Sequence, residues 1–355
     1  MPEIRLSASL YQRFLTCPKS ASFSVDPEFQ KHSKPSIRAA LGMVSHELIE
    51  NSARISQDWN LEEITEWFET NWEIFVGKHY GELVAKWDPN SVPKPHSWPG
   101  YFATRAAAKT LVIKNSALLP PKSDFGIAKV SENREERGYV LPLIEKFLVS
   151  IDLGIVGKPD FVFLEDRRAT IYDYKFGNNQ EDLEKHRIQM YFYQLLVESV
   201  IKVEVGRLAI VASANRVWEI ISSRPEIEKL KSDIPRVIAA LQTGKVAAIP
   251  STQNCKYCPF KASCDPFKTA NIEISPGRPM AITGEVLLVR KIDENFQELV
   301  VKARMGTTIE DVKVFGVPSQ YAISTGHRVF LSDNLDFRDE KIIGFSWNSR
   351  ITIQD

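Results

Sequence analysis

Two aspartates and a lysine in the middle of the sequence have the residue types and spacing of a metal-dependent hydrolytic site. Asp160 follows Gly157-Lys158-Pro159, and Asp173 and Lys175 come later with Tyr174 between them. Residues two apart on a strand point to the same face, so Asp173 and Lys175 are expected side by side, and Asp160 can approach Asp173 across a hairpin. Converging carboxylates repel unless a cation lies between them, and Mg²⁺ or Mn²⁺ prefers such oxygen ligands.

This arrangement predicts phosphodiester hydrolysis. A metal held by the two carboxylates would acidify a bound water and polarise a phosphoryl oxygen, while Lys175 would orient the water and neutralise developing charge. The alternative is that Asp173 and Lys175 form an ordinary surface pair on an edge strand, because short charged triplets are common.

Two further pairs lie at helical spacing on either side of this stretch. Gln189 and Tyr193 are four residues apart in a predicted helix, so both project from one face toward the end of the sheet. Upstream, Gly42 and His46 have the same spacing in the segment SIRAALGMVSHELIENSAR, which is apolar at helical intervals.

The motifs GKPD, DYK and Gln-x-x-x-Tyr, in this order, resemble the PD-(D/E)XK nuclease superfamily and in particular its RecB-like branch. The resemblance implies an α/β, restriction-endonuclease-like core with a mixed sheet flanked by helices. It also implies Lys175 as the catalytic lysine, with Gln189 and Tyr193 contacting phosphate or the lysine, since neither coordinates a hard cation strongly.

The same resemblance implies the metal ligands His46, Asp160 and Asp173. A lone helical histidine is more often structural, but Gly42-x-x-x-His46 matches an element whose histidine is a ligand in that branch, and an imidazole would favour Mn²⁺. Glu145, before the first predicted strand, lies where members often carry a glutamate and is considered only as an outside candidate.

The four cysteines are the remaining candidate ligands. Cys255, Cys258 and Cys264 form C-x2-C-x5-C, and Cys17 precedes Pro18 far upstream. This pattern is similar to that of the helicase-associated and CRISPR-adaptation nucleases, and the resemblance implies a 4Fe–4S cluster that ties residue 17 to residue 255 around the nuclease domain. Zinc, which more often uses two close cysteine pairs, and unligated thiols are the alternatives.

Periodicity divides the chain into regions. We expect a nuclease domain over residues 1–270 that includes a helical lobe at about 55–138, where tryptophans recur at helical spacing and favour core packing over base stacking. Residues 274–355 show five short β-rich runs, which predict a small all-β barrel, OB-like or SH3-like. Four cations in this region indicate either contact with DNA or an ordinary solvated face, and docking of a protein partner is the competing role for the region. The cations are Lys302, Arg304, Lys313 and Arg328.

Composition excludes little by itself. The 45 basic and 45 acidic residues cancel, so any DNA-binding surface must be local, and no apolar run long enough for a membrane span is present. We expect a cytoplasmic DNA nuclease, acting on single strands or ends as an exonuclease in repair, recombination or CRISPR- or phage-related processing, with DNA and a helicase or other DNA-processing protein as partners. The alternative is a DNA-binding or structural subunit that assists a helicase or an integration complex and cuts little.

Overall fold

The computed structural model describes the chain apart from residues 1–3, 31–35, 53–54, 56–58, 87–91, 119–141, 176–182, 214–215, 271, 276–277, 306–307, 334, 340, 347–348 and 355. The chain divides into two compact units. The first comprises Met1–Arg13, Pro35–Lys86 and Lys94–Lys245, and the second comprises Phe14–Lys34, Trp87–Pro93 and Val246–Asp355. The predicted domain boundary at residues 270–274 stays a prediction, and the predicted lobe at 55–138 lies partly outside the described residues.

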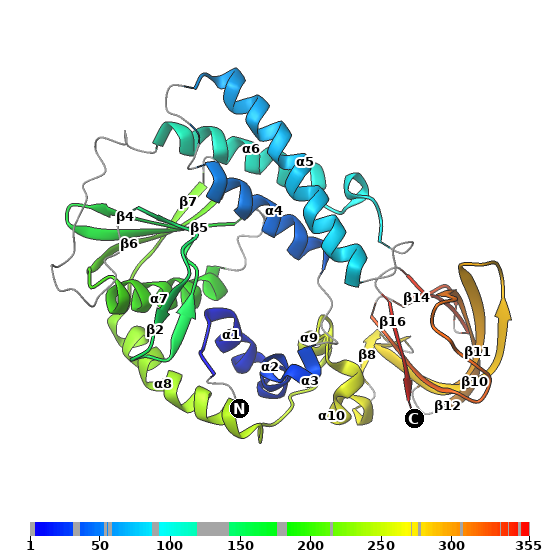
Figure 1. Ribbon diagram of the computed structural model, residues 1–355. Helices are drawn as coiled ribbons and strands as arrows, with labels where there is room; N and C mark the ends of the chain where they lie inside the picture. The colour runs from blue at the N-terminus through cyan, green and yellow to red at the C-terminus, as the bar shows by residue number, and fades with distance from the viewer. Residues whose placement is uncertain are drawn as a thin grey trace. The chain divides into compact units, whose positions relative to one another are not determined.

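A five-stranded mixed sheet forms the centre of the first unit, in the order β1-β4-β5-β6-β7 (Figure 1). Its strands are β1 (Leu143–Ile144), β4 (Phe161–Glu165), β5 (Arg168–Tyr174), β6 (Val205–Ser213) and β7 (Arg216–Ile220). Strands β4 and β5 form the predicted hairpin, and its turn residues Asp166 and Arg167 both have positive φ, as in tight hairpin turns. Strands β5 and β6 are parallel, so α7 (Leu183–Val200) serves as the crossover that parallel pairing requires.

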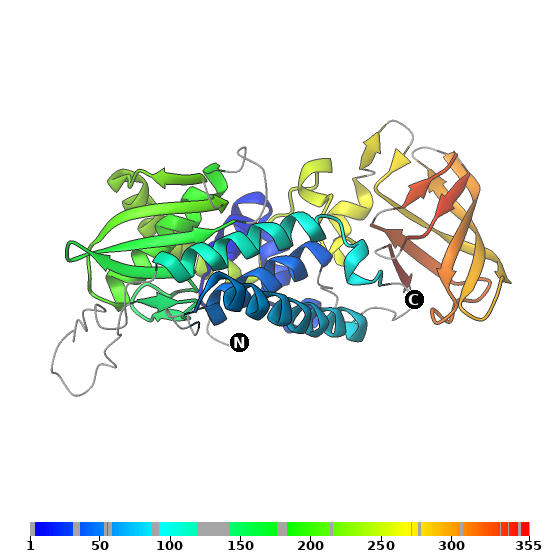
Figure 2. The same cartoon turned by 90° about the horizontal axis from the view of Figure 1, so that it is seen from above.

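Helices cover both faces of this sheet, as the fold class predicts. Helix α7 packs against β5 and β6 on one face. On the other, Tyr174 and Val211 pack with Ile49 of α4 (Ile37–Ser52) and Leu111 of α6 (Tyr101–Leu118). Helix α5 (Leu61–Lys86) lies beside α4 and α6 (Figure 2). Because side chains alternate along β5, Asp173 points away from Tyr174 and toward α7.

The remaining elements of the first unit support this core. The hairpin of β2 and β3 packs against α7. Helix α8 ends at Gly244, which has the left-handed conformation that stops a helix. Phe68 and Trp72 are fully buried, which confirms the predicted core packing. The elements are β2 (Leu148–Ser150), β3 (Ile155–Gly157), α8 (Arg224–Thr243) and η1 (Pro95–Ser97), with α1 (Ala8–Thr16) beginning in this unit.

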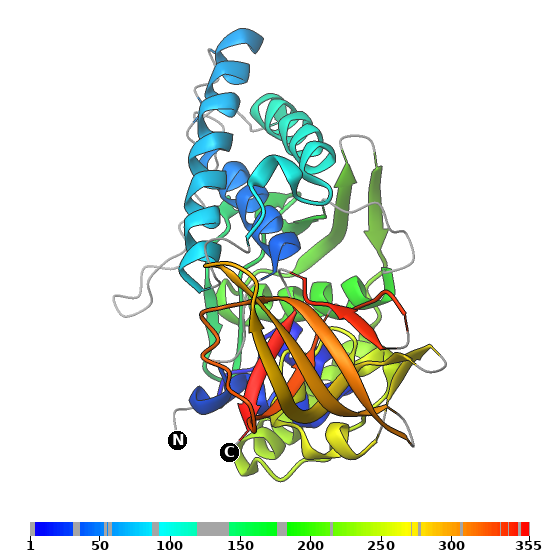
Figure 3. The same ribbon diagram turned by 90° about the vertical axis from the view of Figure 1, so that its right-hand side faces the viewer.

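A curled seven-stranded sheet dominates the second unit, in the order β14-β15-β12-β11-β10-β13-β16 (Figure 3). Its strands are β10 (Ala281–Lys291), β11 (Phe296–Met305), β12 (Thr308–Pro318), β13 (Arg328–Ser332), β14 (Asp336–Phe337), β15 (Ile342–Gly344) and β16 (Arg350–Gln354). The all-β prediction is confirmed, but the described strands form an open half-barrel with β14 and β16 at its edges. The sheet curls tightly at Gly284, where a Cβ atom would lie 2.5 Å from the Lys302 carbonyl oxygen.

Short elements flank or contain the cysteines of the second unit. They are α2 (Pro18–Val25), α3 (Pro27–Gln30), α9 (Thr252–Cys255), η3 (Lys261–Ser263), α10 (Asp265–Thr269), β8 (Glu273–Ser275) and β9 (Arg278–Pro279). Across both units, none of the helices in the described ranges is long and apolar enough to cross a membrane. The cytoplasmic location stays a prediction.

Candidate metal centre

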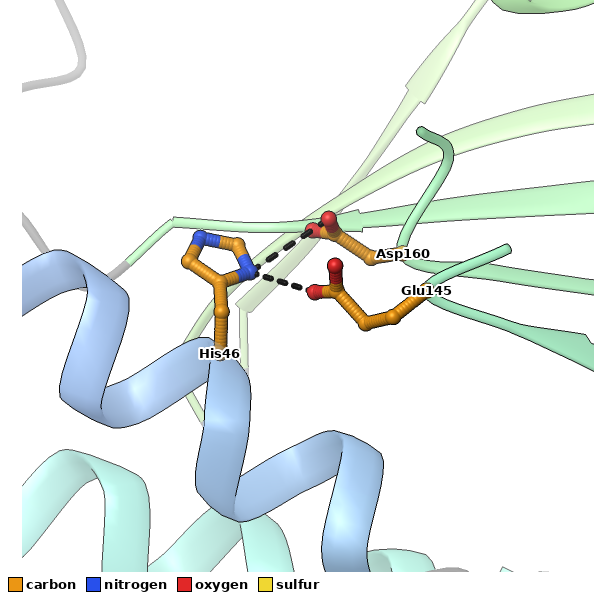
Figure 4. Close-up of side chains that lie close together, drawn as sticks. All are labelled: His46, Glu145 and Asp160. Atoms are coloured by element: carbon orange, nitrogen blue, oxygen red, sulfur yellow. Dashed lines mark hydrogen bonds and ion pairs between the residues drawn. The ribbon is translucent and has the colours of Figure 1, made fainter. Parts of the chain in front are cut away.

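Three side chains from separate segments of the first unit converge on one point (Figure 4). His46 comes from α4, Glu145 follows β1, and Asp160 precedes β4. The His46 Nδ1 atom lies 2.8 Å from Glu145 Oε1 and 3.4 Å from Asp160 Oδ1. One ligand atom from each residue lies within 4.8 Å of the other two, the spacing that a single metal ion requires. Both carboxylates are buried, whereas the imidazole is partly exposed.

Backbone geometry fixes the two acidic ligands. Glu145 adopts a left-handed conformation with φ 49°, which is costly for a residue with a Cβ atom, and its N–H donates to the Asp160 carbonyl oxygen at 2.9 Å. The Tyr174 N–H donates to Asp160 Oδ2 at 2.6 Å, so the neighbouring strand holds that carboxylate in place. On the outer side, Lys158 Nζ lies 2.7 Å from Glu145 Oε2.

The charges of this cluster shift its protonation equilibria. Burial lowers the pKa of His46, but the hydrogen bonds and negative charges of Asp160 and Glu145 outweigh burial and raise it to about 10. Burial, followed by the charge of Asp173, raises the pKa of Asp160 to about 6. Burial also raises the pKa of Glu145, but hydrogen bonds from His46 and Lys158 hold it below its ordinary value. A protonated imidazole therefore supplies positive charge to this acidic cluster.

Asp173 and the predicted catalytic lysine lie directly beside this cluster. Asp173 is fully buried, and its Oδ2 atom lies 2.6 Å from Lys175 Nζ. The Gln189 amide donates to Asp173 Oδ1 at 3.1 Å and to the Tyr193 hydroxyl oxygen at 2.8 Å. The Tyr193 hydroxyl thus keeps its own hydrogen for another acceptor. The sequence pairs Asp173 with Lys175 and Gln189 with Tyr193, and the fold brings the four side chains together.

The set of three converging ligands differs in one member from the predicted set. His46 and Asp160 meet as expected, but Glu145 is the third residue of the compact group, and Asp173 contacts Lys175 and Gln189 instead. Glu145 is only an outside candidate in the sequence because it belongs to no local motif. Lys158, its ion-pair partner, was not singled out at all, although it lies in the GKPD motif.

The chemistry of these residues fits a divalent cation. Buried carboxylate oxygens are the ligands of Mg²⁺ and Mn²⁺, and an imidazole nitrogen among them favours Mn²⁺. The buried Asp173 Oδ2 atom, beside this cluster, lies 2.6 Å from the Lys175 ammonium, which balances its charge. Gly42, the glycine four residues before His46 in the predicted helical pair, is not needed for close packing, because a Cβ atom at this position would meet no atom within 4 Å.

The four cysteines come together in the second unit. None is in a disulfide, and all four line one small cavity whose walls include Phe23, Phe260 and Phe267. The Ile249 N–H donates to Cys17 Sγ at 3.5 Å, and the Ser20 hydroxyl lies 3.6 Å from Cys258 Sγ. Burial and the neighbouring sulfurs raise the pKa of Cys255 and Cys264. Four thiols around one apolar cavity fit a thiolate-ligated metal or cluster.

A buried lysine supports the cysteine loop and was not predicted. The Lys261 ammonium donates to the carbonyl oxygens of Cys255 and Cys258 at 2.8 and 3.1 Å, and it lies 2.6 Å from Asp333, which directly follows β13 of the curled sheet. Arg350, on β16, donates to the Pro259 carbonyl oxygen. The loop that carries three cysteines is therefore bound to the curled sheet by charged groups.

Comparison with known proteins gives one informative match. The family model described as the PD-(D/E)XK nuclease superfamily matches residues 5–265, a range that contains His46, Glu145, Asp160 and all four cysteines. No curated protein matches the chain. Among solved structures, a murine DNA-binding protein bound to double-stranded DNA is 11% identical, covers 60% of this chain and 93% of its own, and has a TM-score of 0.18. That score is too low to support a common fold.

Proposed function

Because the chain belongs to the PD-(D/E)XK nuclease superfamily, we propose that it is a divalent-metal-dependent deoxyribonuclease of the RecB-like branch that acts on single strands or ends. The observation that carries the proposal is the convergence of His46, Glu145 and Asp160 in one buried cluster, beside the ion pair of Asp173 and Lys175. Glu145 and Asp160 place two buried carboxylates beside one imidazole, and a bound cation would offset the free-energy cost of these buried like charges.

Each residue of the cluster has a distinct role under this proposal. His46, Glu145, Asp160 and Asp173 hold the ion, which when bound supplies a Lewis acid that acidifies water and polarises a phosphoryl oxygen. Asp173 holds the Lys175 ammonium at the end of β5, where it orients the attacking water and stabilises negative charge on the phosphate. Gln189 positions the Tyr193 hydroxyl, which donates its hydrogen to a phosphate oxygen.

A cleavage assay tests the proposed activity. Purified protein is incubated with end-labelled single-stranded and double-stranded DNA, linear and circular, in Mn²⁺, Mg²⁺ or EDTA. We expect cleavage in Mn²⁺ that EDTA abolishes, and we expect Asp173→Asn and Lys175→Met to lower the rate by about a hundredfold or more. Lys229→Met, an exposed lysine on α8, is the matched control and should cleave like the wild type.

The substrate panel separates the alternatives. Activity on linear but not circular DNA supports an exonuclease, and activity on both supports an endonuclease. Cleavage that survives EDTA or the two site variants contradicts the proposed mechanism. A wild-type protein that binds DNA but does not cut it under any metal condition would instead be the accessory subunit of a helicase or integration complex.

The cysteine site of the second unit holds a 4Fe–4S cluster under the same proposal. The support is the common cavity of the four thiols, together with N–H and O–H groups close to two of the sulfurs, as is usual around iron–sulfur clusters. The ligands are Cys17, Cys255, Cys258 and Cys264. Cys17 comes from the N-terminal part of the chain, so the cluster closes a long loop and limits the freedom of the unfolded chain.

Spectroscopy and metal analysis test this assignment. Anaerobically purified protein should be brown, with iron and acid-labile sulfide at about four each per chain. Cys17→Ala should lose the colour and become less stable. Zinc in place of iron, or a fully coloured and equally stable Cys17→Ala protein, contradicts the cluster without affecting the proposed nuclease activity.

A further inference from the structure

A groove of about 620 Å³ lies within the second unit and shares Phe267 with the lining of the cysteine cavity. One wall is the segment from α10 to β9, which contributes Phe267, Lys268 and Glu273. The floor is one face of strands β11, β10, β13 and β16. The groove uses residues of the second unit only, so it exists independently of how the two units are arranged.

The floor is the outer face of the curled sheet. The inner face is a closed apolar core that includes Ile282, Val301 and Val329. The neighbours of these residues along each strand point outward, and strand pairing places Lys302 opposite Glu285 and Glu285 opposite Arg328. A charged row thus crosses three adjacent strands, with about 5 Å between neighbouring strands.

Part of this outer face is already covered. Phe330 of β13 packs with Phe267 and Met280, so the cysteine-bearing segment buries the face near β13. The part toward β11 stays exposed and carries Lys302 and Arg304, while Ile309 of β12 is 67% exposed at its end. The groove is the boundary between the covered and the uncovered parts.

Positive charge predominates in the groove although the chain as a whole is neutral. Its lining includes four cations, Lys268, Lys302, Arg304 and Arg328, and two carboxylates, Glu273 and Glu285. One of the cations, Lys268, forms an ion pair with Asp265. Within the described part of the chain, no acidic side chain forms an ion pair with Lys302 or Arg328. These two side chains are exposed and contribute nothing to the apolar core.

We propose that this groove binds the phosphate backbone of single-stranded DNA, as a second contact of the protein with the substrate of its nuclease centre. The proposal rests on the proposed nuclease function for the identity of the polyanion. A positively charged groove that follows the backbone is one of the two parts of such single-strand binding sites, the other being aromatic side chains that stack on bases. The two aromatic side chains of this groove, Phe267 and Phe330, are buried and cannot stack on bases, so binding depends on phosphates and is independent of base sequence.

Charge variants of the full chain test the groove directly. Binding of a fluorescent oligothymidine and of a duplex of equal length is measured by anisotropy in EDTA, on an Asp173→Asn background that prevents cleavage. The triple change Lys302→Gln, Arg304→Gln and Arg328→Gln should weaken single-strand binding about tenfold or more. It should also reduce the slope of log K against log salt by about 2, since each single-strand phosphate contact contributes about 0.7.

Two further variants make the result specific. A control triple variant removes the same charge from exposed positions of the same unit outside the groove and should change binding little. Its changes are Lys256→Gln, Lys291→Gln and Lys341→Gln. Glu285→Gln removes a negative charge from the groove floor and should strengthen binding, an effect that partial unfolding cannot produce.

Equal losses in the two triple variants, no gain from Glu285→Gln, or an effect on the duplex rather than on the single strand would each overturn the proposal. The binding assay contains no divalent metal, so it is independent of cleavage. If the groove variants bind DNA like the control while the wild type shows Mn²⁺-dependent cleavage, only the proposed role of the groove is refuted. Absence of cleavage with groove-dependent binding refutes only the nuclease.

Discussion

At the scale of single residues, Glu145 is the side chain whose importance depends most on the tertiary structure. It is buried in a left-handed backbone conformation, 2.8 Å from His46 and 2.7 Å from Lys158. Strain of this kind persists where the surrounding structure holds a residue in place, and it is frequent at functional sites. Glu145 therefore has the geometry of a metal ligand, while Lys158 keeps its second oxygen oriented.

Removal of the Glu145 charge should weaken the metal site. Glu145→Gln keeps the size of the side chain but replaces a carboxylate oxygen, so we expect the affinity for Mn²⁺ to fall by about tenfold to a hundredfold. Titration calorimetry with Mn²⁺ measures the change, with Glu204→Gln as an exposed control in the same unit. Unchanged affinity in Glu145→Gln would remove Glu145 from the ligand set.

Protonation of His46 gives the metal-free protein a defined pH dependence. Its pKa is about 10 in the folded state and ordinarily 6.5, so its contribution to stability is fully present below pH 6.5 and is lost as the pH rises toward 10. Asp160 titrates below this window, at about 6. Urea unfolding in EDTA should show a free energy of unfolding that falls between pH 6.5 and 10, and the fall should be smaller in His46→Gln. An equal pH dependence of the free energy of unfolding in the two proteins would contradict this.

At the scale of elements, the contact between β3 and α7 places Tyr193. Gly157 ends β3, and a Cβ atom there would lie 2.7 Å from Leu196 and 3.2 Å from Tyr193. Both neighbours are on α7, the helix that also carries Gln189. Only a residue without a side chain allows this close approach, which explains the glycine that begins the GKPD motif.

Gly157→Ala should therefore disturb the site through α7. Overpacking of this kind costs about 1–3 kcal/mol, and displacement of Tyr193 should lower the cleavage rate while Mn²⁺ affinity changes little. Thermal unfolding, calorimetry and the cleavage assay measure the three effects. The control is Gly81→Ala in α5, where a Cβ atom meets nothing within 4 Å. Equal melting temperatures and rates in the two variants would exclude the packing argument.

At the scale of the whole molecule, each unit contains its own candidate site. In the second unit, Lys261 connects the cysteine loop to the curled sheet. Its buried ammonium bonds both the cysteine loop and Asp333, which directly follows β13. Loss of this cation leaves a carboxylate and several carbonyl oxygens without their donor.

Lys261→Met should accordingly destabilise the second unit. Removal of one partner of a buried ion pair costs about 3–5 kcal/mol, so we expect earlier proteolysis of the C-terminal sheet and lower retention of any metal or cluster at the cysteines. Pulse proteolysis and metal analysis test both effects. Lys256→Met, an exposed lysine in the same loop, should behave like the wild type; if Lys261→Met does so too, the bridge is not important for stability.

The sequence by itself determined the features that depend on local spacing. Alternation along a strand sets Asp173 beside Lys175, helical spacing sets Gln189 beside Tyr193, and the nuclease family follows from the order of these motifs. The α/β class and the β-rich C-terminal region follow from periodicity in the same way.

Only the tertiary structure decided which distant groups meet. Glu145 lies beside His46 and Asp160 because its left-handed backbone conformation directs it toward the start of β4, and no local sequence pattern predicts this contact. The groove likewise depends on which face of the curled sheet the cysteine segment covers, and the open edges at β14 and β16 depend on strand pairing rather than on strand propensity. Long-range packing and register set these features, and a linear pattern contains neither.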